Sequence, residues 1–215
     1  MDPTVKKNQK QPLNTSRKPE NHRYIWRSPI AWSVSFFLGI NSFLMYIFIS
    51  WLPSILISDG YTDQAAGMIQ GLLQFSTAVP ALILIPLMAK ITDKRLMTFS
   101  FAIITFISLM GFLFLPQYAA IWTFMFGFSA GAGFILGLSF MALRTSTPNQ
   151  AAALSGMSQC FGYLLAATGP ILMGSLHQMT KHWTVPLIFC AIISIIWGIF
   201  ALIASKEDII SQPIN

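Results

Sequence analysis

Residues 30–57 read IAWSVSFFLGINSFLMYIFISWLPSILI, an apolar stretch without a single charged side chain. About 20 consecutive apolar residues are enough to cross the hydrocarbon core of a bilayer as an α-helix. Five more apolar runs follow, at 64–89, 96–115, 119–143, 150–176 and 184–204. The composition agrees, with 54% hydrophobic and 9% charged residues. The sequence therefore predicts an all-α membrane protein with six transmembrane helices.

The basic residues between these runs indicate how the helices cross the membrane. Short loops that carry Lys and Arg stay on the cytoplasmic side. If the N-terminus is cytoplasmic, twelve of the thirteen Lys and Arg residues fall on that side, and only Lys181 lies outside. We therefore expect both termini in the cytoplasm. Aromatic residues of the kind that anchor helices at the interface lie at the expected outer ends, namely Trp51, Tyr61, Tyr118, Trp122 and Trp183.

Three segments follow from this pattern: a basic, disordered cytoplasmic segment at 1–28, a transmembrane bundle at 29–205, and a cytoplasmic tail at 206–215. A basic segment could bind nucleic acid or anionic lipid, but beside a membrane span its simpler role is to set the topology. We therefore expect the lipid bilayer as a partner and no nucleic acid. Residues 1–28 lack the apolar region of a signal peptide, so the first helix is expected to be retained.

Nothing in the sequence indicates catalysis or a cofactor. No P-loop, nucleophile elbow or metal-ligand spacing occurs. Cys160 and Cys190 lie inside expected helices, where a thiol usually acts as a small apolar side chain. The three histidines lie in the N-terminal segment and the last outer loop rather than on a helix face. The sequence predicts neither an enzyme nor a bound metal or cofactor.

Recognition inside the membrane must come from uncharged polar side chains, because the six runs contain no Asp, Glu, Lys or Arg. An unpaired amide in lipid is costly, so each such group faces either a neighbouring helix or a water-filled cavity, and both alternatives stay open. Asn41, with Tyr46 further along the helix, is the sharpest candidate for solute contact. Two polar stripes at helical spacing consist of Gln70, Gln74 and Thr77, and of Ser155, Gln159, Gly162 and Tyr163.

The fourth run has small residues along one side. Gly127 and Gly131 are four residues apart, as are Gly133 and Gly137, and such spacing allows close approach of another helix. Tight packing is the simpler interpretation, and gating flexibility is a secondary hypothesis. Arg144, at the inner end of the same run, is interpreted as one more cytoplasmic anchor in preference to a gate or an anion-binding group.

A weak internal repeat relates the two halves of the chain. The second run opens Asp63-Gln64-Ala65-Ala66 and the fifth opens Asn149-Gln150-Ala151-Ala152, with Asp63 and Asn149 as expected N-caps. These two helices are three spans apart, so they run in opposite directions. The first three helices are therefore expected to pair with the last three as an inverted repeat, as in six-helix transporter halves.

Several short stretches also carry a family resemblance. They are Arg27-Ser28-Pro29, Ala31-Trp32, Trp51-Leu52-Pro53, Arg144-Thr145, Ala151-Ala152-Ala153-Leu154-Ser155-Gly156-Met157, Gly162-Tyr163-Leu164-Leu165-Ala166-Ala167, Gly169-Pro170, Leu176-His177, and Trp183 followed by Pro186-Leu187. Over roughly residues 26–205 the chain thus resembles the C-terminal half of major facilitator superfamily carriers, in the branch of cyanate and nitroimidazole transporters.

The resemblance implies an arrangement of the helices around a cavity. The first and fourth helices would line it, the second and fifth would flank it, and the third and sixth would support it from outside. Carried over to this chain, the cavity candidates are Asn41, Tyr46, Gln74, Ser129 and Gln159, beside Gln70 and Tyr163 from the polar stripes. The resemblance also implies an inner gate at the loop of Asp93, Lys94 and Arg95, although the glycines usual there are missing.

Family members are similar to a chain of twelve helices, so we expect a half-length or truncated secondary carrier of a small polar or anionic solute, cyanate-like solutes included. Residues 1–28 would then correspond to the loop between the halves, with Met1 as an internal or truncated start. Alternating access needs two bundles, so the expected partner is a matching N-terminal half or a second copy. The alternatives are a homodimeric channel or carrier with the glycine surface as its dimer face, and a non-transporting remnant or split subunit.

Overall fold

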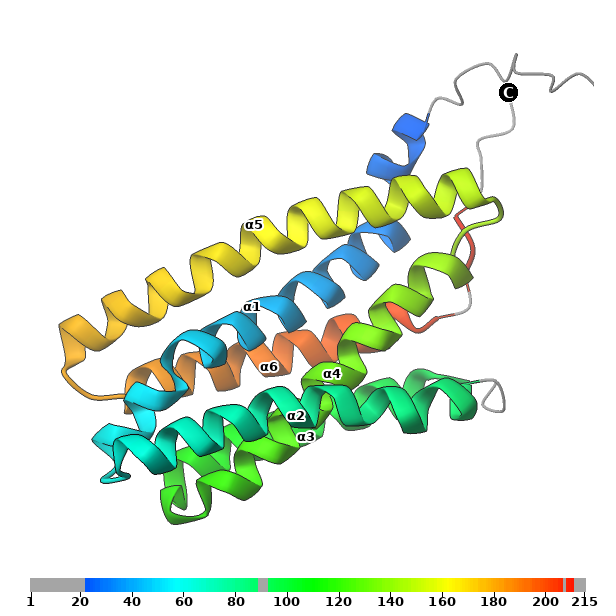
Figure 1. The fold of residues 1–215 in the computed structure, drawn as a ribbon. Helices are drawn as coiled ribbons and strands as arrows, with labels where there is room; N and C mark the ends of the chain where they lie inside the picture. The colour runs from blue at the N-terminus through cyan, green and yellow to red at the C-terminus, as the bar shows by residue number, and fades with distance from the viewer. Residues whose placement is uncertain (1–21, 89–92, 207, 211–215) are drawn as a thin grey trace, which may run out of the picture.

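Each apolar run forms one α-helix in the computed structural model, which describes residues 22–88, 93–206 and 208–210 (Figure 1). The prediction of an all-helical protein with six membrane-spanning helices is confirmed, and the described residues contain no strand. The helices are α1 (Pro29–Ser58), α2 (Asp63–Met88), α3 (Arg95–Phe114), α4 (Ala119–Leu143), α5 (Pro148–Thr180) and α6 (Thr184–Ala204). Two short 3-10 helices, η1 (His22–Arg27) and η2 (Pro116–Tyr118), precede α1 and α4.

The largest difference from the expected bounds is at the end of α5. Its apolar run stops at residue 176, but the helix continues to Thr180. It ends where Lys181 adopts a left-handed conformation with φ of 62°, which closes the last turn through a hydrogen bond from the Lys181 N–H to the His177 carbonyl. Hydropathy marks the part of a helix inside the lipid, whereas the cap marks where the helix ends.

The N-caps of α2 and α5 also differ from those expected. The side chains of Thr62 and Thr147 each accept a hydrogen bond, 3.2 Å long, from the backbone N–H three residues further on. Asp63 and Asn149, expected as caps, instead lie in the first turns of the two helices. At α5 the reason is Pro148, whose fixed φ suits the first helical position and leaves the preceding Thr147 to cap.

The packing of the helices repeats between the two halves of the chain. α1 packs mainly against α5, and α4 packs mainly against α2. In a repeat of three helices, α4 corresponds to α1 and α5 corresponds to α2. The α1–α5 contact is therefore equivalent to the α4–α2 contact, as an inverted repeat requires. α3 and α6 pack against each other. The fold is therefore half of a major facilitator type of architecture with an internal 3+3 repeat.

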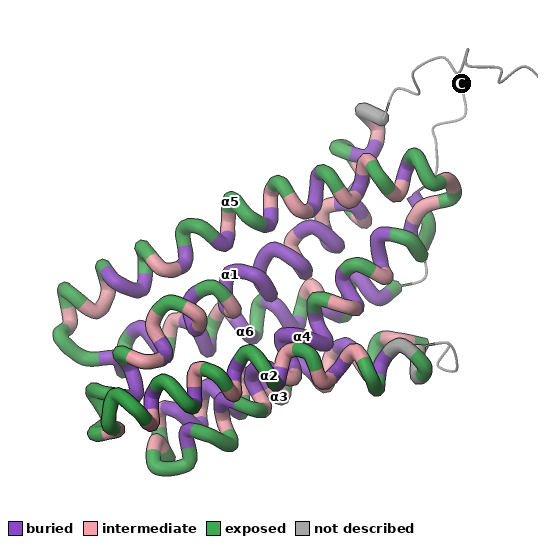
Figure 2. Tube along the Cα trace, in the orientation of Figure 1, coloured by how far each residue is buried: buried purple, intermediate pink, exposed green. Residues whose placement is uncertain are grey.

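α1 and α4 lie at the centre of the bundle, and Figure 2 shows how burial is divided among the helices. In an apolar stretch of 18 residues from each membrane span, 56% of the residues are buried in the α1 span and 61% in the α4 span. The buried share is 22% in both the α2 and the α5 span. α3 and α6 expose rows of large apolar side chains, including Ile103, Ile107, Ile192, Ile195 and Ile199. Such rows suit contact with lipid.

Both ends of the described chain lie at one end of the bundle, with the α2–α3 and α4–α5 connections (Figure 1). The basic residues of this end include Arg27, Lys94, Arg95, Arg144 and Lys206, while Lys181 lies in the α5–α6 connection at the opposite end. The charge asymmetry therefore marks the end shared by the termini as cytoplasmic.

The segment before α1 differs from the expectation of disorder up to residue 28. Residues 1–21 lie outside the described part of the chain, but residues 22–27 form η1. Ile25 is 1% exposed, and the Trp32 Nε1–H donates to the Trp26 carbonyl at 2.8 Å. The physical reason is local composition, because the apolar residues that end this basic stretch can be buried against the bundle.

Gly127 and Gly131 of α4 allow close contact with α2. A Cβ atom added at Gly127 would overlap the Ser76 Oγ, and one added at Gly131 would overlap the backbone carbonyl of Thr77. Both glycines are buried. The two backbones are therefore close enough that neither position has room for a methyl group.

The other two glycines of α4 face different neighbours. A Cβ at Gly133 would come within 2.5 Å of the Trp197 ring of α6, and one at Gly137 within 2.8 Å of Leu38 of α1. All four glycines are thus covered by helices of the same chain. The dimer face suggested by the sequence is already occupied, so a homodimer would have to use another surface.

The C-terminal segment packs against the α4–α5 connection. The backbone N–H of Ile210 donates to the Arg144 carbonyl at 2.9 Å, and the Ile210 side chain is 2% exposed. Arg144 is itself buried, its Nε donates to the Ala204 carbonyl at 3.2 Å, and its guanidinium lies 5.4 Å from the centre of the Phe140 ring. These contacts hold the cytoplasmic ends of α4 and α6 together. Gate or anion-binding functions of Arg144 remain predictions.

Replacing Ile210 by aspartate should release this segment. Burial of an Ile side chain contributes roughly 1.5–3 kcal/mol, and a carboxylate at the same place would be left in an apolar site. We expect a melting temperature several degrees below that of the unchanged protein in detergent. Ile209→Asp is the matched control, because Ile209 is 55% exposed. Equal melting temperatures for the two variants would show that the contact adds no stability.

Candidate functional site

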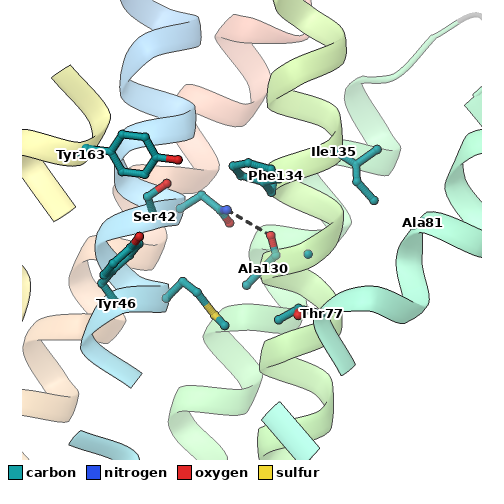
Figure 3. A pocket seen from close by; sticks show the side chains of 11 residues that line it. Ser42, Tyr46, Thr77, Ala81, Ala130, Phe134, Ile135 and Tyr163 are labelled. Carbon is teal, nitrogen blue, oxygen red and sulfur yellow. Dashed lines mark hydrogen bonds between the residues drawn. The ribbon is translucent and has the colours of Figure 1, made fainter. Parts of the chain in front are cut away.

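A cavity of about 380 Å³ lies between α1, α2, α4 and α5 (Figure 3). This volume is at the lower end of the range for small-molecule pockets. The cavity, which we call the pocket, is lined by Asn41, Ser42, Met45, Tyr46, Thr77, Ala81, Ala130, Gly131, Phe134, Ile135 and Tyr163. Its lining comes from the two central helices and their two flanking partners, and from neither α3 nor α6.

The pocket lies close to the middle of the membrane-spanning helices. Asn41 and Tyr46 lie within three residues of the midpoint of α1, and Tyr163 is next to the midpoint of α5. Thr77 and Ala130 are equally close to the midpoints of α2 and α4. Membrane carriers bind their solutes at this depth, between helices of their repeats.

Asn41 provides the buried amide of the pocket. It is 4% exposed, and its Nδ2 donates to the Ala130 carbonyl of α4 at 3.0 Å. An Asn side chain has two N–H groups and an acceptor oxygen, so one N–H and the Oδ1 are left over. A Cβ added at Gly133 would come within 2.6 Å of the Oδ1, so this glycine leaves room for the amide.

Tyr46 and Tyr163 form one side of the pocket. Their ring centres are 6.5 Å apart and the rings meet edge to face at 78°. The side chains are 43% and 48% exposed, and no hydrogen bond joins either hydroxyl to another residue of the pocket lining (Figure 3). A phenol hydroxyl in hydrocarbon is costly without a partner. Two of them at mid-membrane depth therefore indicate a cavity that water or a solute enters.

The pocket has polar groups but no charge of its own. None of its eleven lining residues is Asp, Glu, Lys, Arg or His. α1 and α4 contain no charged residue along their whole length. Any recognition by this half of the site must therefore use hydrogen bonds and aromatic contacts.

Four other candidates from the sequence do not line the pocket: Gln70, Gln74, Ser129 and Gln159. Ser129 is buried against α3, where it bonds the Thr105 hydroxyl at 2.7 Å. The Gln159 Nε2 donates to Ser155 of its own helix at 2.8 Å, and Gln74 is exposed. These contacts are of the interhelical or local kind rather than contacts with a cavity. A role for these residues in solute binding stays a prediction.

The Gln70 side chain supplies a hydrogen-bond donor that Pro53 cannot supply within α1. Pro53 has no N–H, so the Ile49 carbonyl four residues earlier lacks its helical donor. The Gln70 Nε2 of α2 donates to this carbonyl at 3.0 Å. Gln70 of the polar stripe on α2 therefore serves, at least in part, the packing of α2 against α1.

A double-mutant cycle between Gln70 and Pro53 should show this coupling. Gln70→Leu alone leaves the Ile49 carbonyl unpaired and should cost about 1 kcal/mol of stability. In a Pro53→Ala background the new backbone N–H can reach that carbonyl, so we expect the cost of Gln70→Leu to fall by at least half. Thermal unfolding of the four proteins in detergent measures the difference. Additive effects would mean that the amide does not serve the carbonyl.

The cytoplasmic loop candidates lie at the start of α3. The Asp93 carboxylate accepts a hydrogen bond from the Arg95 backbone N–H at 2.9 Å. Lys94 precedes α3 directly, whereas residues 89–92 of the same loop lie outside the described part of the chain. A role of this loop as an inner gate stays a prediction.

Of the cavity candidates named from the sequence, Asn41, Tyr46 and Tyr163 line the pocket. Thr77 and Gly131 were named only as parts of a polar stripe and a packing surface, and the other lining residues were missed. Phe134 is the most consequential of these, because it is an aromatic side chain, 40% exposed, across the pocket from the two tyrosines (Figure 3). One apolar residue in an apolar helix carries no signal of its own. Its position three residues after Gly131 on α4 becomes meaningful only when the facing helix is known.

Comparison with known proteins agrees with the architecture. The family model described as "Major Facilitator Superfamily" matches residues 2–170. The chain belongs to this superfamily. As a member of it with six apolar spanning helices, the protein is a multi-pass protein of the inner membrane.

Three curated relatives show how much of a longer transporter the chain matches. It is 48% identical to the 2-nitroimidazole transporter of Escherichia coli (strain K12), covering 91% of this chain and 49% of that protein. It is 39% identical to an uncharacterized transporter of Bacillus subtilis (strain 168), covering 87% and 47%. The cyanate transport protein CynX of Escherichia coli (strain K12) is 26% identical, covering 77% and 43%. The chain therefore spans about half the length of these relatives.

Proposed function

We propose that the chain is one six-helix half of a secondary carrier for a small polar or anionic solute, and not an enzyme. The observation that carries this proposal is the uncharged, largely apolar pocket at mid-membrane depth, which holds a few hydrogen-bonding groups and is formed by the two central helices and their flanking partners. The superfamily membership supports transport, and relatives named for 2-nitroimidazole and cyanate indicate solutes of this size.

A second half is required for this function. The lining residues come from only four helices, and both pocket tyrosines are almost half exposed. Alternating access works by one bundle rocking against another around the solute site. The curated relatives are about twice as long as the matched part, so we propose a matching N-terminal six-helix half as the partner.

Uptake experiments can test this proposal directly. In a chimeric carrier, which we call the fusion, this chain replaces the matching half of the Escherichia coli 2-nitroimidazole transporter. The 48% identity to the replaced part of that transporter supports this choice of partner half. We expect cells with the fusion to take up labelled 2-nitroimidazole or cyanate, and cells with the chain alone to show only background uptake.

Two outcomes would change the conclusion. If the chain alone gives full uptake, it works without another half, and a homodimeric carrier or channel becomes the better account. If the fusion reaches the membrane in normal amounts but moves neither solute, the chain is a non-transporting remnant.

A further inference from the structure

We propose that Trp197 of α6 is a positioning residue for solute binding, because it fixes the turn of α1 from which Asn41 reaches the pocket. This inference rests on the proposed transport function and on Asn41 as a contact of the solute. Trp197 does not line the pocket, and the family resemblance implied only an outer supporting role for α6. The exposed side of α6 carries Ile195 and Ile199, whereas Trp197 is 1% exposed and buried within the bundle.

The indole of Trp197 is bonded to the backbone of α1 one helical turn before Asn41. Its Nε1–H donates to the Phe37 carbonyl at 2.9 Å, and this contact is buried. In an α-helix the same carbonyl accepts the backbone N–H of the residue four positions later, which here is Asn41. A carbonyl oxygen has two lone pairs, so it can accept from both donors. Trp197 therefore holds the turn of α1 that runs from Phe37 to Asn41.

A ring contact reinforces this hydrogen bond. The ring centres of Phe37 and Trp197 are 5.4 Å apart, and the rings are nearly parallel, at 15°. Both side chains are buried. A single hydrogen bond would leave the turn free to pivot about one pair of atoms, whereas a stacked ring beside it restricts that rotation. The two contacts together fix both the position and the orientation of this part of α1 relative to α6.

Gly133 of α4 lies where the indole and the Asn41 amide meet. A Cβ atom added at Gly133 would come within 2.5 Å of the Trp197 ring and within 2.6 Å of the Asn41 Oδ1. Three residues earlier on α4, the Ala130 carbonyl accepts the hydrogen bond from Asn41. The amide is thus enclosed between α4 and the turn that Trp197 holds. In a close-packed interior, a change at Trp197 must therefore move the amide or leave a gap beside it.

Trp197→Phe in the fusion tests the proposal. Phenylalanine keeps an aromatic ring at the buried position but removes the N–H group. We expect the concentration of 2-nitroimidazole needed for half-maximal uptake to rise about threefold to tenfold, the factor that one hydrogen bond of ordinary strength carries. The maximal uptake rate per molecule of fusion in the membrane should change less than twofold. A loss of solute binding raises the required concentration without slowing the later steps of transport.

Trp51→Phe is the matched control. The Trp51 Nε1–H also donates to a backbone carbonyl, that of Pro170, at 2.9 Å, and Trp51 does not line the pocket. We expect its half-maximal concentration to stay within twofold of that of the unchanged fusion. If the two variants raise this concentration equally, or if Trp197→Phe lowers only the amount of fusion in the membrane, Trp197 has a purely structural role and the proposal is wrong.

Hydrogen exchange separates this failure from a failure of the transport proposal, because it needs no solute. In the purified fusion, the backbone amides of residues 38–42 should exchange about threefold to tenfold faster in Trp197→Phe, and at an unchanged rate in Trp51→Phe. A fusion that transports neither solute but shows this difference would reject the proposed function and retain Trp197 as the residue that holds the Asn41 turn. Unchanged exchange in Trp197→Phe would overturn the proposal whether or not the fusion transports.

Discussion

Replacing Gly131 by alanine is expected to destabilise the bundle by about 1–3 kcal/mol, the usual cost of adding a methyl group where there is no space. The added Cβ would overlap the Thr77 carbonyl, and its three nearest atoms are all backbone atoms of that residue. No side-chain rotation can relieve this contact, so α2 and α4 must move apart. The melting temperature in detergent and the amount of folded protein in the membrane should both fall.

Gly71→Ala on α2 is the matched control for this prediction. A Cβ at Gly71 meets no atom within 4 Å. Because alanine favours the helix over glycine by up to about 1 kcal/mol, this variant should be as stable as the unchanged protein or more so. If the two alanine variants melt at the same temperature, the backbones of α2 and α4 are not in close contact at Gly131.

Replacing Asn41 by leucine is expected to reduce uptake by the fusion at least tenfold. Leucine has a similar size but removes the only amide that lines the pocket, together with its bond to the Ala130 carbonyl. A site that loses a hydrogen bond to its solute discriminates strongly against it. A single interhelical hydrogen bond in a membrane is worth about 0.6 kcal/mol on average. The abundance of the protein should therefore remain nearly unchanged.

Gln159→Leu tests the sequence-based prediction of solute contact for a polar residue outside the pocket, and it is therefore compared with Asn41→Leu. Gln159 does not line the pocket, and its amide bonds Ser155 on the same helix. We therefore expect uptake within about twofold of the unchanged fusion, as for most substitutions away from a site. Equal losses in the two variants at equal abundance would mean that polarity matters generally in these helices, and that Asn41 has no special position.

The fold could be predicted from the sequence because the bilayer imposes a simple rule. In lipid, the backbone N–H and C=O groups of a long apolar run such as residues 30–57 find their hydrogen-bond partners within the same segment when that segment forms a helix. Helix ends followed other rules. The extension of α5 to Thr180 depends on a left-handed cap at Lys181, and η1 depends on burial of Ile25, neither of which hydropathy reports.

The site could be predicted only in part. Asn41, Tyr46 and Tyr163 line the pocket, whereas the equally polar Ser129 is covered by α3. Helical periodicity places a residue on a face, but it does not say whether that face meets another helix or a cavity. The same limit applies to Gln70, whose partner is a backbone carbonyl that a proline on another helix left unpaired.

The measurement closest to the central claim is the reactivity of a single cysteine in the pocket toward a charged, membrane-impermeant thiol reagent. Tyr46→Cys and Ile107→Cys are placed separately in a fusion lacking other cysteines, including Cys160 and Cys190. The two side chains are 43% and 44% exposed and lie near the middle of α1 and α3. They differ in their surroundings, because Tyr46 lines the pocket and Ile107 faces the lipid. We expect modification of the first, slowed by 2-nitroimidazole, and none of the second. An unreactive Tyr46→Cys, or equal reaction at both, would contradict a solute pocket at mid-membrane depth.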